Sequence, residues 1–166
     1  MTDDEVIADV LRREGGYVDD PADRGGATHF GITAATLGEW RRLGRPATRD
    51  EVQALTDDEA TAIYRARYVR PFETVPFPEV RAHLVDFAVH SGVTTAIKTL
   101  QRVLGVPDDG ILGERTRTAL VVYPWRLTQA ALVAERVKLL SRLVDKDAKQ
   151  SRFLRGWVKR AVGFLV

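Results

Sequence analysis

Apolar residues recur at helical spacing through almost the whole of this 166-residue chain, and glycine or proline ends most of the runs. The first run follows a capping-box pattern at Thr2 and Glu5 and stops at Gly15-Gly16, which predicts a helix. By similar signals, further helices are expected over residues 33–40, 56–70, 79–91, 94–104, 114–121, 125–148 and 153–165. Residues 17–32, rich in Gly, Asp and Pro, leave room for a short β-hairpin at most. The sequence therefore predicts a mainly α fold.

The two C-terminal segments carry long apolar stripes, and such stripes normally face a core. Over 125–148 the stripe consists of Leu127, Ala130, Ala131, Ala134, Val137, Leu140 and Val144. Over 153–165 it consists of Phe153, Leu154, Trp157, Val158, Ala161, Val162 and Leu165. We expect the last segment to dock on the core. Its alternative is a basic amphipathic helix that lies on a membrane or an anionic wall.

Composition places the chain among globular proteins, because 45% of its residues are hydrophobic and 29% are charged. Its length allows one domain with a sizeable core, or one domain with a small appended module. The lack of cysteine excludes a disulfide framework, a thiolate metal site and a cysteine nucleophile, and suits synthesis in the reducing cytoplasm. We find no signal-peptide pattern in the acidic N-terminus and no apolar run near the roughly 20 residues that span a bilayer.

Charge is distributed unevenly, although the formal net charge is only +2. Residues 1–28 hold eight acidic against three basic side chains, whereas residues 146–160 hold six basic against one acidic. The basic end suggests an anionic partner, which could be nucleic acid, a membrane surface or a cell-wall polymer. A merely solvated charged face explains the same pattern.

Glu14 is the first candidate for catalysis. It lies four residues after Val10 and seven after Ile7, so on a helix it extends the same apolar stripe and should point toward the protein. A carboxyl partly withdrawn from water keeps its proton more readily, as a general acid near neutral pH must. Gly15 and Gly16 lack a β-carbon and let another chain approach closely, which suits a substrate groove. The alternative is an ordinary capping or surface glutamate.

Asp23 and Thr28 follow in a loop that Gly25-Gly26 can fold back toward the end of the first helix. A carboxylate and a hydroxyl opposite a carboxylic acid are the equipment for glycoside hydrolysis. In that reaction one group protonates the leaving oxygen, and another activates or positions a water. The simpler interpretation of Asp23 is a turn former in a loop rich in Pro and Gly.

A longer motif resembles a known family. It reads Glu14-Gly15-Gly16-Tyr17, then Asp23-x-Gly25-Gly26-x-Thr28-x-x-Gly31-Ile32-Thr33. This closely resembles the signature of the glycoside hydrolase family 108 muramidases, lysozyme-like peptidoglycan hydrolases of phages, prophages and bacterial secretion loci. The resemblance implies a lysozyme-like helical fold with Glu14 as the general acid. It makes Asp23 and Thr28 candidates for holding or activating water.

Substrate contacts are expected around the same motif. The candidates are Tyr17, Gly26, His29, Tyr64 and Tyr68. Family members often have Asn where His29 stands, which leaves the contact of this side chain open. Tyr64 and Tyr68, together with Trp40, could stack on sugar rings, although aromatic residues at helical spacing more often belong to a core.

Residues 97–120 resemble peptidoglycan-binding modules. The shared pattern is Leu100-Gln101, Gly105-Val106, Asp109-Gly110, Gly113 and Thr116. Even without a ligand, this pattern provides a tight turn and a helix start. Residues 86–92 resemble the family's central helix, and the pattern Phe153-x-x-Gly156-Trp157-x-x-Arg160 matches its closing motif. Asp86 and His90 share a helix face, where a hydrogen-bonded pair is expected and no metal site is.

The resemblance covers most of the chain, with a catalytic region at 1–92 and a binding-like helical region at 93–166 packed on it. It implies a monomeric muramidase that cleaves the β-1,4 bond between N-acetylmuramic acid and N-acetylglucosamine in peptidoglycan glycan strands. No metal or organic cofactor and no nucleic acid are expected. The enzyme would act in the periplasm or cell wall after release through a holin or other export machinery.

Two other classes of function remain open from the sequence. One is a non-catalytic wall-binding or structural protein of a phage-like particle. The other is a helical nucleic-acid-binding protein that uses the basic C-terminus. Whether a hydrolase of this type inverts or retains depends on the carboxylate separation, which the sequence does not give.

Overall fold

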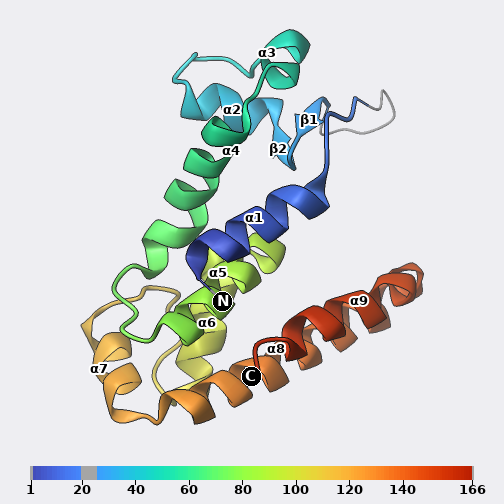
Figure 1. Ribbon diagram of the computed structural model, residues 1–166. Coiled ribbons are helices and arrows are strands. Elements are labelled where there is room, and N and C mark those ends of the chain that lie inside the picture. The colour runs from blue at the N-terminus through green and yellow to red at the C-terminus, as the bar shows by residue number, and fades with distance from the viewer. Residues whose placement is uncertain (1, 20–25, 166) are drawn as a thin grey trace. The chain divides into compact units, whose positions relative to one another are not determined.

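The computed structural model describes residues 2–19 and 26–165. Within these ranges the elements are helices apart from one two-stranded antiparallel sheet, which confirms the expected mainly α class (Figure 1). The chain forms two compact units. One comprises Asp4–Arg70, and the other comprises Met1–Asp3 and Pro71–Val166.

The first unit carries the expected hairpin between short helices. Its elements are α1 (Asp3–Glu14), β1 (Thr28–His29), β2 (Ile32–Thr33), α2 (Ala34–Trp40), α3 (Arg49–Gln53), α4 (Asp57–Tyr64) and the π-helix η1 (Arg65–Val69). Threonines begin three of the helices, because the hydroxyls of Thr33, Thr48 and Thr56 each accept a hydrogen bond from a backbone N–H in the first turn. The α1 helix ends at Glu14, directly before the Gly15-Gly16 pair, as predicted.

Two features of this unit were not predicted. The α3 helix was missed, although Thr48 and Glu51 form a complete capping box at its start. The helix expected over 56–70 changes at Arg65 into a π-helix, in which the N–H of Arg70 bonds to the carbonyl of Arg65, five residues earlier. The widened turn is the last one before Pro71, so almost no helical residues follow it in which a shifted hydrophobic phase would show.

The second unit is built around one buried helix. Its elements are η2 (Arg70–Phe72), α5 (Pro78–Ser91), α6 (Val93–Val103), α7 (Glu114–Val122), α8 (Trp125–Lys146), η3 (Ala148–Gln150) and α9 (Ser151–Val162). Residues 82–88 of α5 are all buried, and α5 packs against α6 and α8, while α8 also packs against α9. Among the described residues, no helix combines the length and apolar character that crossing a membrane requires.

The predicted apolar stripe of α8 is wrong in phase. Leu127 is 59% exposed, and of the predicted stripe only Leu140 is buried. The face that is buried consists of Thr128, Gln129, Leu132, Val133, Arg136 and Leu140. Polar side chains occupy half of it because each finds a partner: the amide of Gln129 donates to the carbonyl of Phe164 at 2.8 Å, and Arg136 pairs with Asp86.

The predicted stripe of the last segment is only partly buried. Ala161 is buried, whereas Leu154, Trp157 and Val158 are half-buried. Phe153, Val162 and Leu165 are exposed. This helix therefore docks along one narrow edge of its stripe, which partly confirms the expected docking on the core.

Candidate active site

The carboxylate of Glu14 lies against the turn of the hairpin. A β-carbon added at Gly31 would lie 3.0 Å from Oε2 of Glu14 and 3.1 Å from the hydroxyl oxygen of Tyr64. Such distances are shorter than ordinary carbon–oxygen contacts, so glycine leaves the space that these two side chains occupy. Gly31 also has a φ of +70°, which favours glycine on its own. The glycine of the sequence motif is therefore required for both backbone and packing reasons.

The predicted burial of Glu14 is wrong, because this residue is exposed. The apolar stripe of α1 is buried at Val6, Ile7 and Val10, but the helix ends at Glu14 and the chain turns at Gly15, whose φ is +74°. A residue at the apolar position of the last turn is therefore not necessarily buried, unlike a residue at the same position inside the helix. The carboxylate is consequently accessible to solvent while its other side faces Gly31.

The turn beside Glu14 contains a strained residue. Phe30 and Gly31 join β1 to β2, and both have positive φ, at +51° and +70°. A two-residue type I′ hairpin turn needs this combination, and Asn-Gly usually supplies it. For phenylalanine the left-handed conformation costs about 1–2 kcal/mol. Two contacts hold it: the Tyr64 hydroxyl donates to the Phe30 carbonyl at 2.9 Å, and the His29 ring stacks on the Phe30 ring at 4.1 Å.

Thr28 is brought back to the end of α1 by backbone pairing. Val18 and Thr28 exchange two backbone hydrogen bonds of 2.8 Å each, and Thr28 pairs with Thr33 on the other strand. Since Val18 is four residues after Glu14, this pairing returns the chain to the same end of the unit. Within the described residues no hydrogen bond joins the Thr28 and Glu14 side chains. Asp23 lies outside the described residues.

The five predicted substrate-contact residues have different surroundings. Tyr17 and His29 are half-buried and meet edge to face, with ring centroids 6.3 Å apart, and Nδ1 of His29 lies 3.2 Å from the Val52 carbonyl oxygen. Gly26 is exposed at a φ of +67°. Tyr68 is half-buried, with its ring 5.5 Å from that of Tyr64.

Tyr64 does not fit the predicted stacking on a sugar ring, because only 5% of it is exposed. Its ring belongs to the core of the unit, and its hydroxyl serves the hairpin turn. Burial raises the pKa of Tyr64, and the charge of Glu14 raises it further. The phenol therefore stays protonated and remains a donor to the Phe30 carbonyl. The residues Phe30 and Tyr64 are the parts of this site whose roles the sequence did not show.

Two pockets open on the first unit. One, of about 470 Å³, is lined by Asp4, Ile7, Ala8, Leu11, Arg12, Phe30, Asp57, Thr61 and Arg65. The other, of about 410 Å³, is lined by Thr36, Glu39, Trp40, Arg42 and Arg67. Glu14 lines neither of these two pockets.

The peptidoglycan-binding-like motif of the second unit gathers around Gln101, which is 1% exposed. Nε2 of Gln101 lies 2.7 Å from Asp109 Oδ1, 2.9 Å from the Ile111 carbonyl oxygen and 3.1 Å from Thr116 Oγ1. Its amide oxygen accepts the N–H of Gly110 at 2.8 Å. The residues of the motif thus close the turn between α6 and α7, which is the scaffold role expected of them even without a ligand.

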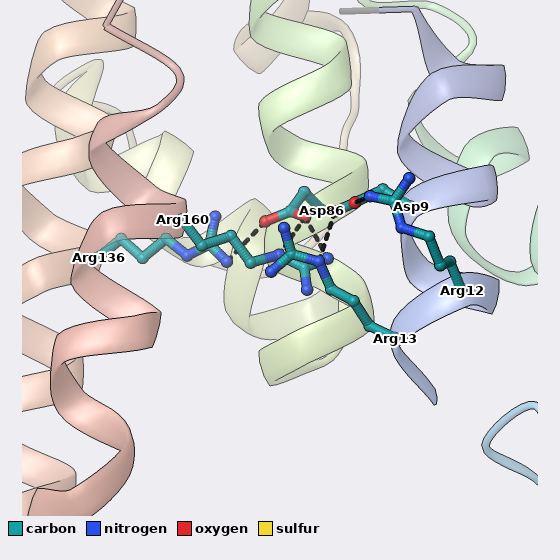
Figure 2. A network of polar contacts seen from close by, with 6 residues as sticks. All are labelled: Asp9, Arg12, Arg13, Asp86, Arg136 and Arg160. Atoms are coloured by element: carbon teal, nitrogen blue, oxygen red, sulfur yellow. Dashed lines mark hydrogen bonds and ion pairs between the residues drawn. The ribbon is translucent and has the colours of Figure 1, made fainter. Parts of the chain in front are cut away.

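Asp86 pairs with two arginines, so the predicted pair with His90 is wrong. Nη2 of Arg136 lies 2.7 Å from one carboxylate oxygen, and Nε of Arg160 donates to the other at 2.6 Å (Figure 2). Burial alone raises the pKa of the Asp86 carboxyl, but the two guanidinium groups outweigh it and hold this pKa below its ordinary value. The His90 ring instead meets Trp157 edge to face at 5.2 Å.

These contacts account for the arginine of the closing motif, since Arg160 ties α9 to α5. On α1, Asp9 pairs with Arg12 and Arg13 (Figure 2). In the described part of the chain, no cluster of three or more His, Cys, Asp or Glu side chains is arranged to hold a metal ion.

Comparisons with known proteins agree with these features. The family model described as Glycosyl hydrolase 108 matches residues 7–92, and the one described as Predicted Peptidoglycan domain matches residues 95–162. The solved structure of SagA from Brucella abortus is similar at 37% sequence identity and a TM-score of 0.74, covering 98% of this chain and 95% of that one. No curated protein matches the chain. The chain therefore belongs to the glycosyl hydrolase 108 family and is a glycoside hydrolase whose second half matches a peptidoglycan domain.

Proposed function

We propose that the chain is an N-acetylmuramidase that cleaves the β-1,4 bond between N-acetylmuramic acid and N-acetylglucosamine, with Glu14 as the general acid. The observation that carries the proposal is the position of the Glu14 carboxylate, exposed at the end of α1 and set against Gly31. An acid on a helix end beside a rigid turn can meet a polymer that approaches from solvent. Its proton can then be delivered to the glycosidic oxygen at a defined place.

The hairpin turn is the positioning device in this proposal. Tyr64 fixes the Phe30 carbonyl by its hydrogen bond, and Gly31 lets the Glu14 carboxylate approach the turn. Strain stored at Phe30 is of the kind that clusters at active sites, where surrounding structure holds a residue in an uncommon conformation. Asp23 and Thr28 are proposed to hold or activate the water, and the Val18–Thr28 pairing supports this role for Thr28.

The region at 93–166 is proposed to hold the enzyme on peptidoglycan. Support comes from the matching peptidoglycan domain and from the buried Gln101, which gives the turn between α6 and α7 a fixed shape. A wall-bound enzyme works on a local concentration of glycan strands far above that in solution. In this proposal the protein is a monomer that acts in the periplasm or cell wall after release by export machinery such as a holin.

The test is digestion of purified peptidoglycan by the wild type, by Glu14→Gln and by the control Glu73→Gln. Glu73 is also exposed and makes no polar contact with a described residue, so its change removes the same charge elsewhere. We expect Glu14→Gln to be slower by about 100-fold or more, because general acid catalysis supplies that much. Glu73→Gln should match the wild type in a turbidity assay.

Product analysis separates the remaining alternatives. Mass spectrometry should find muramic acid at the new reducing ends, and N-acetylglucosamine there would refute the proposed bond. Full activity in Glu14→Gln would refute the proposed acid. Binding to peptidoglycan without any released product would support the wall-binding alternative.

A further inference from the structure

The pocket beside Trp40 on the first unit has a composition that suits a ligand. We call it the Trp40 pocket; it is lined by Thr36, Glu39, Trp40, Arg42 and Arg67 and holds about 410 Å³. Trp40 is 40% exposed, and its ring contacts no other aromatic ring among the described residues. An indole with an open face offers a large apolar plane at a small cost in conformational entropy. A pocket of this size can take one sugar residue.

Arg42 is held in the pocket by a strained backbone. Its φ is +56°, a left-handed conformation that costs a non-glycine residue about 1–2 kcal/mol. The strain is imposed by the turn after α2, because the Arg42 N–H bonds to the Glu39 carbonyl at 3.1 Å and the Leu43 N–H to the Gly38 carbonyl at 3.0 Å. These two bonds form the Schellman cap of α2, which fixes where the Arg42 side chain leaves the backbone.

The charge of Arg42 is the one that the pocket leaves unbalanced. Arg67 is already engaged, since its guanidinium bonds to Glu39 at 2.6 Å and to Thr36 at 3.0 Å. Arg42 forms no hydrogen bond or ion pair through its side chain with any residue that the structure describes. With two arginines against one glutamate, the lining carries one excess positive charge. A carboxylate is the natural partner of a free guanidinium beside an apolar plane.

The Trp40 pocket is linked to the hairpin beside Glu14 by a row of threonines. Thr28 and Thr33 face each other across the sheet, and the Thr33 and Thr36 hydroxyls lie 3.2 Å apart. Thr36 in turn accepts from Arg67 in the pocket lining. All of these residues belong to one compact unit.

We propose that the Trp40 pocket is a binding subsite for a sugar residue that carries a peptide, with the sugar ring on Trp40 and a peptide carboxylate on Arg42. The inference rests on the proposed function for the polymer concerned, which is peptidoglycan. It adds a specificity to that function: the enzyme prefers glycan strands that retain their peptides over strands from which the peptides have been removed.

The experiment measures binding and not turnover, in a chain that carries Glu14→Gln to stop hydrolysis. Isothermal titration compares soluble peptidoglycan fragments with their stem peptides against the same glycans after the peptides are cleaved off. Arg42→Gly is the decisive variant, because glycine removes the charge and also relieves the positive φ, so that the fold is retained. Arg155→Gln on α9 is the control for charge, since Arg155 is exposed and has no polar partner among the described residues.

We expect the peptide-bearing fragments to bind more tightly than the fragments without peptides. Arg42→Gly should lower the affinity for the peptide-bearing fragments by about tenfold, the value of one charge-assisted contact. Trp40→Ala should weaken both kinds of fragment, and Arg155→Gln neither. An unchanged preference in Arg42→Gly would overturn the inference, as would equal binding of both fragments by the unmodified pocket. Unchanged affinities in Trp40→Ala would overturn it too.

The two proposals fail in different ways. If the wild type cleaves no wall but binding still depends on Arg42, the proposed hydrolysis is wrong and the subsite stands. If hydrolysis depends on Glu14 while binding ignores Arg42 and Trp40, the subsite is wrong and the proposed function stands.

Discussion

Replacing Gly31 by alanine tests whether the hairpin turn positions Glu14. The added β-carbon meets Oε2 of Glu14 at 3.0 Å and the Tyr64 hydroxyl at 3.1 Å, so one or both must retreat by a few tenths of an ångström. Alanine at a φ of +70° also costs about 1–2 kcal/mol of backbone strain. If Tyr64 retreats, its hydrogen bond to Phe30 weakens, which costs about 1 kcal/mol more.

The control is Gly44→Ala, which carries the same strain without the contact. Gly44 has a φ of +68°, and a β-carbon there meets nothing within 4 Å. Urea unfolding should show that both variants are destabilised. The free energy of unfolding of Gly31→Ala should be about 1 kcal/mol below that of Gly44→Ala. Peptidoglycan digestion well below both melting temperatures should be about tenfold slower in Gly31→Ala, because small displacements of a catalytic group cost that much or more.

The comparison between the two variants decides the matter. Equal digestion rates in Gly31→Ala and Gly44→Ala, at equal folded fractions, would refute the idea that the turn positions the acid. Equal stability of the two would show that the close contact is relieved without strain, and the structural argument from Gly31 would then be wrong.

Two further predictions concern the second unit. Asp86→Asn should lower the free energy of unfolding by about 3–5 kcal/mol, because it leaves two guanidinium groups without a counter-charge. The exposed control Asp145→Asn should change it little. Since the folded-state pKa of Asp86 is lowered, this stabilisation is present above the unfolded pKa and lost as the pH falls through the folded one, so the difference should shrink in acid. Gln101→Ala should lower the free energy of unfolding by about 1–3 kcal/mol, because it leaves the Gly110 N–H and its neighbours unpaired. The exposed control Gln53→Ala should change it little, and urea unfolding measures both.

Local signals in the sequence were sufficient for most element positions. Capping threonines such as Thr56 and stop signals such as Gly15-Gly16 act within a few residues, so their structural effect can be predicted without knowing the rest of the fold. The hairpin was predictable for the same reason. The α3 helix shows that a capping box alone, at Thr48 and Glu51, is as informative as a hydrophobic stripe when the helix is only five residues long.

Features that depend on distant partners were not predictable. The buried face of α8 includes Arg136, which is favourable only because Asp86 lies 50 positions earlier in the sequence and supplies the opposite charge. A prediction from apolar periodicity places such an arginine on the exposed face, so it assigns the wrong face of the helix to the core. The exposure of Glu14 has a local cause that the apolar pattern does not show. Because α1 ends at Glu14, the apolar stripe is no longer buried at that residue. The strain at Phe30 and Arg42 depends on backbone angles that no residue type reveals.

The π-helix η1 has a consequence for comparing this chain with its relatives. Its wide turn holds one residue more than an α-helical turn of the same rise, between Tyr64 and Arg70. A relative that lacks this residue would align well on either side and still differ here, because each residue removed from a helix rotates the remaining C-terminal part by about 100°. If the residue removed lies before Arg67, Arg67 loses its contacts with Thr36 and Glu39. A single-codon deletion would therefore change the lining of the Trp40 pocket while Glu14 and its hairpin turn stay in place.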